Sequence, residues 1–173
     1  MATELSTIAS KYTDDLQSEP PTRPIPAMKS VRLAVNVASC DGLPCLLVIG
    51  RNETELTRLN AKLGAVIWEP ELAGQFICAS TTQTSDLSII KGDTPTSGYL
   101  IVRPDAYGLE GEAIASIQEP ASATAFTSSL LEVAANYQRL AKSHGQHVRQ
   151  GRQSGISWDT EVAVPERRRV RPQ

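Results

Sequence analysis

A continuous apolar run followed at once by an amphipathic segment most constrains what this chain can fold into. The run "LPCLLVIG" (43–50) has strand length and places four large aliphatic residues side by side at 46–49, as in a strand covered on both faces. In the next segment, "NETELTRLNAKLG" (52–64), Asn52 can cap a helix, Glu55 stands three positions on as in a capping box, and the closing glycine predicts the helix end. A buried strand that runs directly into such a helix is half of a βαβ unit. The pair therefore predicts an α/β fold with this strand at the centre of the sheet.

Further elements alternate along the chain in the same way. They are a helical turn opened by Pro70, a strand through 76–79, a short helix over 85–92, strands over 98–102 and 112–117, and a long helix over 122–145 that Gly145 ends. The connection between the last two strands is so short that they should form an antiparallel hairpin. The expected core is thus a central mixed four-stranded sheet flanked by helices.

Residues 29–39 fit two patterns equally well. A helical stripe and a strand alternation both run through this segment, with Val31, Ala34, Val35 and Ala38 on the former and Val31, Leu33, Val35 and Val37 on the latter. The local sequence does not decide between them.

Composition divides the chain into one domain and two arms. Residues 1–28 end in "SEPPTRPIP" and predict a proline-rich linker, residues 29–145 form the domain, and residues 146–173 are a flexible tail without periodicity. The formal net charge is -2, but residues 142–173 carry +4 by themselves. Neither a membrane-spanning run nor a signal peptide is visible, so we expect a cytoplasmic protein. No GxGxxG motif or metal-ligand set predicts a cofactor.

The segment "DTPTSGYLIV" (93–102) gives the element order a specific resemblance. It looks like the loop in which thioredoxin-like proteins place a cis-proline followed by threonine directly before the third core strand, with Pro95 and Thr96 at those positions. A cis X–Pro bond costs only about 0.5 to 1 kcal/mol and makes a tight reversal. The resemblance implies a thioredoxin-like fold for residues 29–141, with a cis Thr94–Pro95 bond that turns the chain into an antiparallel strand.

The sequence departs from that family at the position of the family's catalytic motif. Thioredoxins carry Cys-x-x-Cys at the start of the helix after the first core strand, where the helix N-terminus lowers the thiol pKa. The matching segment here reads "GRNETE" (50–55) and has no cysteine, which excludes dithiol exchange at that position. We therefore expect a non-catalytic binding or scaffold module that recognises a protein or peptide partner. The expected peptide groove is formed by Arg51, Asn52, Thr54, Thr94, Pro95 and Thr96.

Two alternatives would make the chain part of an enzyme. Among the three cysteines, Cys45 and Cys78 lie in apolar runs, whereas Cys40 beside Asp41 should meet solvent and could act as a redox thiol. In addition, "YLIVRPDAYG" is similar to a segment near the end of flavin-dependent aromatic hydroxylases, whose C-terminal domain is also thioredoxin-like. That similarity implies a structural subunit associated with a flavin-dependent oxidoreductase; it rests on Arg103, Pro104, Asp105 and Tyr107, which equally suit an ordinary hairpin turn.

The C-terminal tail suggests a third alternative. It combines an aromatic side chain with a basic cluster that could contact nucleic acid or another acidic partner, namely Trp158, Arg167, Arg168, Arg169 and Arg171. The spacing of His144 and His147 could suit a metal, but no further ligands lie near them in the sequence, so we expect no metal site.

Overall fold

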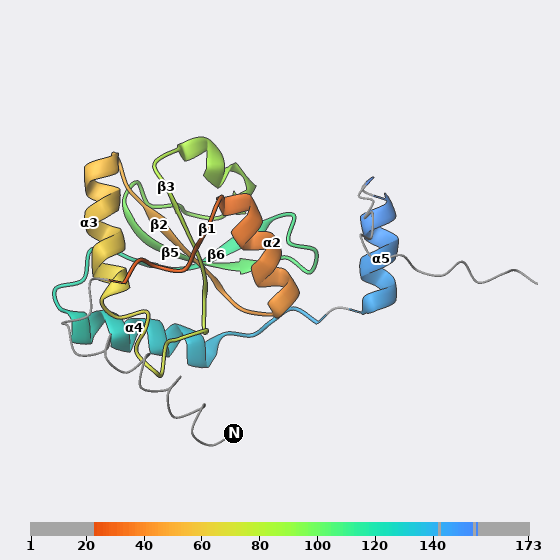
Figure 1. Ribbon diagram of the computed structural model, residues 1–173. Helices are drawn as coiled ribbons and strands as arrows, with labels where there is room; N and C mark the ends of the chain where they lie inside the picture. The colour runs from red at the N-terminus through yellow and green to blue at the C-terminus, as the bar shows by residue number, and fades with distance from the viewer. Residues whose placement is uncertain (1–22, 142, 154, 156–173) are drawn as a thin grey trace, which may run out of the picture. The chain divides into compact units, whose positions relative to one another are not determined.

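A mixed six-stranded sheet organises the first part of the chain (Figure 1). The computed structural model describes residues 23–141, 143–153 and 155. The chain divides into two units, Met1–Ala141 and Lys142–Gln173. In the second unit the structure describes the helix α5 (His144–Gln153), on which Arg149 and Arg152 are exposed.

The strand order in the sheet is β1-β3-β2-β5-β6-β4. The strands are β1 (Ala27–Met28), β2 (Cys45–Ile49), β3 (Ile77–Thr81), β4 (Ile90–Lys91), β5 (Gly98–Pro104) and β6 (Gly111–Ile117). β3 runs parallel to β2 and to β1, whereas β5 runs antiparallel to both β2 and β6. The predicted hairpin is confirmed. The expected number of four strands is wrong, because β1 and β4 contain two residues each and so show no alternation that a sequence could reveal.

Helices cover both faces of this sheet. They are α2 (Val31–Asp41), α3 (Glu53–Gly64), the 3-10 helix η2 (Thr84–Ile89) and α4 (Ala123–Asn136). One core joins α3 and α4 to Leu46 and Val48 of β2, and the other joins α2 and η2 to Leu47 and Ile49. Every residue of β2 is buried. The predicted central, doubly covered strand is therefore confirmed.

Residues 31–41 form a helix, which resolves the ambiguous segment. Ser30 caps α2 by accepting a hydrogen bond from the backbone N–H of Leu33. The helical stripe Val31, Ala34, Val35 and Ala38 is buried, whereas Leu33 on the alternative strand pattern remains 41% exposed. Packing of this stripe on the sheet selects the helix.

α3 begins as predicted and ends for a different reason. The Asn52 side chain accepts a hydrogen bond of 2.9 Å from the backbone N–H of Glu55. Gly64 is the last residue of the helix and does not adopt a left-handed conformation. A Cβ at Gly64 would lie 2.6 Å from the carbonyl oxygen of Arg23. The glycine thus makes room for the N-terminal segment rather than for a helix cap.

The C-terminal end of the proline-rich segment packs on the domain and joins the sheet. The indole N–H of Trp68 donates a hydrogen bond of 3.2 Å to the carbonyl oxygen of Pro24, and Ile25 packs against the core beneath α3. Ala27 and Met28 then pair with β3. Residues 23–28, which we predicted as part of a linker, are therefore bound to the domain.

The last predicted helix is too long. α4 ends at Asn136, where Tyr137 turns extended and its hydroxyl donates a hydrogen bond of 3.2 Å to the carbonyl oxygen of Leu43. Gly145 lies within α5 and ends no helix. The contact of Tyr137 with the start of β2 is tertiary, so the sequence pattern of α4 could not indicate it.

Candidate functional site

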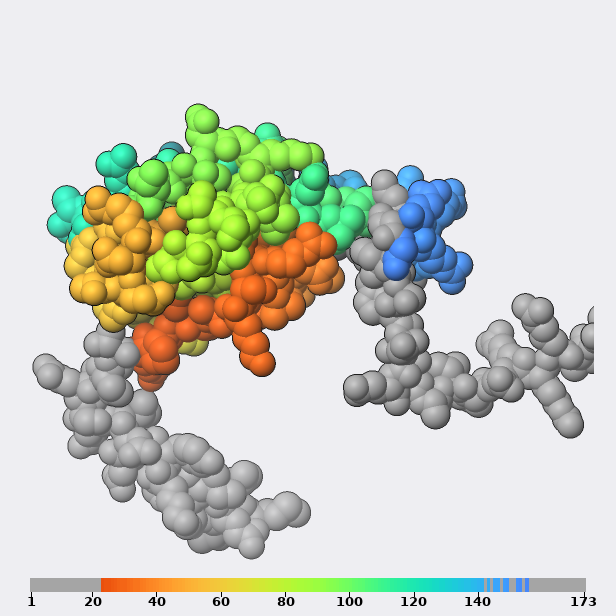
Figure 2. All heavy atoms as spheres, turned by 90° about the horizontal axis from the view of Figure 1, so that it is seen from above, coloured from red at the N-terminus to blue at the C-terminus, as the bar shows by residue number. Residues whose placement is uncertain are grey.

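A hollow of about 260 Å³ opens where the parallel strands β2 and β3 end. In open α/β sheets the crevice at the carboxyl ends of the strands is the usual place for a ligand. Three separate segments line it: Ile49, Gly50 and Arg51 at the end of β2, Thr82, Gln83, Thr84 and Leu87 after β3, and Thr94, Pro95 and Thr96 before β5. Figure 2 shows the lime-green surface of residues 80–97 lying directly against the orange and yellow surface of α3.

The hollow contains four of the six residues predicted for the groove. Arg51, Thr94, Pro95 and Thr96 line it, as proposed from the sequence. Asn52 and Thr54 do not, because Asn52 is occupied in capping α3 and Thr54 lies in its exposed first turn. No motif in the sequence marks residues 82–84, since only the parallel pairing of β2 with β3 brings them to this edge.

The buried carboxylate of Glu55 joins two of the segments that surround the hollow. Glu55 is 9% exposed, and its carboxylate accepts hydrogen bonds from the Arg51 backbone N–H at 2.9 Å, from Nε at 2.9 Å and from Nη2 at 2.8 Å. Ser97, just after the Thr94–Thr96 segment, adds a side-chain hydrogen bond. Glu55 therefore fixes Arg51 on one wall of the hollow and Ser97 beside the other.

These hydrogen bonds also determine the protonation state of Glu55. The Arg51 side chain contributes most, its backbone N–H next, and together with Ser97 they lower the pKa of Glu55 to about 2 despite the partial desolvation. Glu55 is consequently ionised at neutral pH, and its charge compensates that of Arg51. The i,i+4 spacing of Arg51 and Glu55 is the sequence signal for this pair.

A second network shapes the wall that follows β3. The buried hydroxyl of Thr81 donates a hydrogen bond of 2.6 Å to Asp86 and accepts one of 2.9 Å from the backbone N–H of Gln83. Thr82 lies within 3.3 Å of a carboxylate oxygen of Glu53 on α3. Thr81, at the end of β3, thus joins the 82–84 turn to η2, and Thr82 joins it to α3.

The expected cis-proline is wrong. None of the peptide bonds among the described residues is cis, so the Thr94–Pro95 bond is trans. Glycines give the backbone its freedom to turn here, because Gly92 and Gly98 have φ values of 94° and 118°. A Cβ on Gly98 would lie 2.8 Å from the carbonyl oxygen of Ile117, so the entry to β5 requires a glycine. The direction of β5 follows from its antiparallel pairing with β2.

The segment between those glycines leaves its backbone open. Thr94 and Thr96 are exposed, and within the described part of the chain no hydrogen bond involves their backbone N–H or C=O groups. An extended partner can pair with such groups as an added strand does.

The cysteines differ sharply in accessibility. Cys45 and Cys78 are fully buried, and desolvation raises the pKa of both thiols, that of Cys78 to about 12. Cys40 is exposed near the end of α2, as expected. The hollow, as far as it is described, has no cysteine in its lining.

The "RPDAYG" segment forms the β5–β6 turn. The carboxylate of Asp105 accepts hydrogen bonds from the backbone N–H groups of Tyr107 and Leu109, at 3.0 and 2.9 Å. Gly108 has a φ of 63°, and a Cβ there would lie 2.6 Å from the Cα of Asn36, so the turn lies directly on α2. Asp105 has the structural role of a turn former, and Arg103 forms an ion pair with Glu112.

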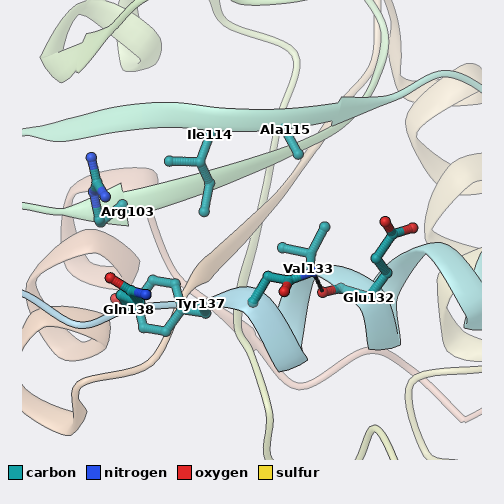
Figure 3. A pocket seen from close by; sticks show the side chains of 8 residues that line it. Arg103, Ile114, Ala115, Glu132, Val133, Tyr137 and Gln138 are labelled. Atoms are coloured by element: carbon teal, nitrogen blue, oxygen red, sulfur yellow. Dashed lines mark hydrogen bonds between the residues drawn. The ribbon is translucent and has the colours of Figure 1, made fainter.

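A second hollow, of about 300 Å³, lies between β6 and the end of α4 (Figure 3). Ile114 and Ala115 of β6 point toward Val133 of α4, while Arg103 and Glu132 lie at opposite ends. Its lining residues come from the hairpin and from the end of α4, and no sequence motif marks them.

Other predicted contacts fall outside this region. Trp158, Arg167, Arg168, Arg169 and Arg171 lie outside the described residues. Where side chains are described, no three His, Cys, Asp or Glu residues come together as a metal site would require. None of the helices in the described ranges combines the length and hydropathy needed to cross a bilayer.

Three comparisons with known proteins found no relative of this chain. No protein-family model, curated protein or solved structure matches this chain. Its function must therefore be inferred from the hollow and the side chains around it.

Proposed function

We propose that this chain is a non-catalytic, thioredoxin-like module that binds an extended peptide in the hollow at the ends of β2 and β3. The observation that carries the proposal is the meeting of Gly50 and Arg51 with Thr94, Pro95 and Thr96 around one opening. The element order inferred from the sequence supports the fold assignment. The trans Thr94–Pro95 bond departs from the family pattern, so the proposal depends on the opening and not on the proline isomer.

The chemistry of the lining supports binding rather than catalysis. Its polar side chains are threonines, a glutamine and an arginine, and the arginine is engaged by Glu55. A nucleophile needs an adjacent base or a lowered pKa to become reactive. The hydroxyls of Thr94 and Thr96 have no such partner among the described residues, but the open backbone beside them offers donors and acceptors to a peptide.

A steric substitution tests this placement. Peptides would be selected on the full-length protein from a random library, and their affinities measured by fluorescence anisotropy. Thr96→Arg should abolish binding, because a long side chain then projects from the lining of the hollow. Thr124→Arg is the matched control, since Thr124 is an exposed threonine on α4 and its replacement adds the same charge. Equal binding by wild type and Thr96→Arg would place the peptide elsewhere.

The second unit favours a separate binding role. α5 has exposed Arg149 and Arg152 and contains no acidic residue. We propose that this basic segment contacts nucleic acid or another acidic partner. Its affinity should then fall steeply with salt and disappear when the chain ends at Ala141, as measured by electrophoretic mobility shift.

A further inference from the structure

We infer that the peptide bound in the hollow is basic, carrying lysine or arginine side chains in an extended segment. This inference rests on the proposed function and names the class of partner. Its basis is the balance of charge around the opening: the arginine in the lining is paired with a carboxylate of the protein itself, whereas the carboxylates next to the lining face solvent.

The ion pair of Arg51 and Glu55 offers hydrogen bonds but little net charge. Arg51 is the only basic side chain among the described residues that line the hollow. Its Nε and Nη2 atoms both bond the carboxylate of Glu55, while 70% of its side chain remains exposed. The N–H groups not used by Glu55 can donate to peptide carbonyl oxygens. The ionised Glu55, which also lies 3.8 Å from Arg58, weakens the attraction that Arg51 would exert on an acidic ligand.

Three exposed carboxylates stand next to the lining. Glu53 accepts a hydrogen bond from Thr82 of the lining, and Asp86 accepts one from Thr81, the residue before Thr82. Asp93 directly precedes Thr94 in the sequence. Each of the three segments around the hollow therefore contains or adjoins one exposed acidic residue, and these three residues are called its rim. Residues 1–141 carry a net charge of -6, so the field of the whole first part of the chain has the same sign.

An extended peptide can use this arrangement. Alternate side chains of a strand repeat about every 6 to 7 Å, so one face would turn toward the opening and the other toward the rim. Lysine and arginine stems are long and flexible enough for their charged ends to reach carboxylates beside the bound backbone. The open backbone of Thr94 and Thr96 would hold the segment, and the rim would select its charge.

Defined peptides test the selectivity on the full-length protein. Three fluorescent peptides alternate valine with lysine, glutamine or glutamate, and their binding is measured by anisotropy. At low ionic strength the lysine peptide should bind about ten-fold more tightly than the glutamine peptide, and the glutamate peptide should bind least. The preference should shrink at about 0.15 M salt, because exposed charges are then screened.

Rim variants assign the preference to particular carboxylates. The double variant Glu53→Gln/Asp93→Asn should reduce the preference for lysine about three- to ten-fold at low ionic strength. Asp86 is left intact because it accepts the hydrogen bond of the buried Thr81. The matched control is Asp41→Asn/Glu71→Gln, which removes two exposed carboxylates distant from the lining and should preserve the preference. Thermal melts by circular dichroism verify that all variants are folded.

The outcomes separate this inference from the proposed function. Equal affinity for the lysine and glutamine peptides, with binding of the glutamine peptide lost in Thr96→Arg, would overturn the basic selectivity and leave the groove in place. An unchanged preference in Glu53→Gln/Asp93→Asn, or an equal loss in the control, would overturn the role of the rim. Failure to select any peptide from the library would overturn the proposed function itself.

Discussion

At the scale of single residues, Glu55 has the largest effect on the candidate site. Its carboxylate accepts hydrogen bonds from Arg51, two residues after β2, and from Ser97, directly before β5. These two segments are far apart in the sequence. A nearly buried charge is tolerated only when it is paired and hydrogen-bonded, and both conditions are met here. The residue that shapes the hollow is therefore not in its lining.

Glu55→Gln should make the free energy of unfolding less dependent on pH in the acid range. The folded-state pKa of Glu55 is about 2, below the value of about 4.3 of an unfolded chain. The contribution of ionised Glu55 to the free energy of unfolding is therefore complete above the pKa of the unfolded chain. It is lost as the pH falls through the folded-state pKa. Urea unfolding should show the variant less stable than wild type at pH 7, with the difference narrowing from about pH 5 toward pH 2.

Glu53→Gln is the control for this measurement. Glu53 is exposed and accepts a single hydrogen bond from Thr82, so its replacement should change stability little at any pH. If the free energies of unfolding of wild type and Glu55→Gln differ by the same amount across the acid range, Glu55 is not stabilised in its ionised form by Arg51.

The three thiols should react in two classes. Native protein treated with a thiol-specific chromogenic reagent should show one reactive group, Cys40, because Cys45 and Cys78 are fully buried and their pKa values are raised. All three should react in denaturant. Cys40→Ser should then have no fast-reacting thiol in the native state; a remaining fast reaction would mean that a core cysteine is accessible.

At the scale of elements, the junction between β2 and α3 forms one wall of the hollow. Gly50 connects them, and its backbone N–H donates a hydrogen bond of 3.1 Å to the carbonyl oxygen of Thr81. A Cβ at Gly50 would lie 2.8 Å from the Cβ of Leu56 and equally close to its backbone nitrogen. The first turn of α3 can pass this close to the strand end only because the residue has no side chain.

Gly50→Ala should destabilise the first unit by about 1 to 3 kcal/mol, the usual cost of forcing atoms into a packed region. Urea unfolding followed by circular dichroism measures the loss. Gly145→Ala is the control, because Ser143 Oγ, 3.9 Å away, is the nearest atom that its Cβ would meet. An unchanged unfolding midpoint in Gly50→Ala would show that α3 can shift away from the strand.

Elements with strong internal patterns were predicted well, and those defined by neighbours were not. The buried run of β2 and the Asn52 cap of α3 appear in the structure as expected. By contrast, residues 29–39 carried two patterns, and contact with the sheet selected the helix α2. α4 ended early because Tyr137 bonds to Leu43, a residue with no local relation to it.

At the scale of the whole molecule, the stable structure is concentrated in the first unit. Both hydrophobic cores consist of residues between Val31 and Leu130, with partly buried neighbours from Ile25 to Ala134. None of the residues from Lys142 onward, so far as they are described, belongs to either core. Burial of apolar surface is the main source of folding free energy, so this unit should fold alone.

A chain ending at Ala141 should therefore retain its stability. Its urea midpoint should match that of the full-length protein, and its formal net charge should become -6 instead of -2. Circular dichroism gives the midpoint, and ion-exchange chromatography verifies the charge. A loss of more than about 1 kcal/mol would show that residues beyond Ala141 contribute to the folded domain.

The candidate site was predictable only in part. Arg51 and Thr94–Thr96 could be named because short motifs mark both segments in the sequence. The resemblance implied a cis Thr94–Pro95 bond, whereas the bond has the trans form that X–Pro bonds favour by about 0.5 to 1 kcal/mol. Residues 82–84 carry no motif and enter the lining only through the pairing of β3 with β2.

The sequence by itself determined the class of fold and the absence of Cys-x-x-Cys after the first core strand. Those features depend on local composition: an apolar run, a capped amphipathic helix, and residue types at fixed positions. Only the tertiary structure decided which segments meet around the hollow, that Glu55 ties them together, and that two more short strands extend the sheet. Such features arise from contacts between residues distant in the chain, whose free energies no local pattern records.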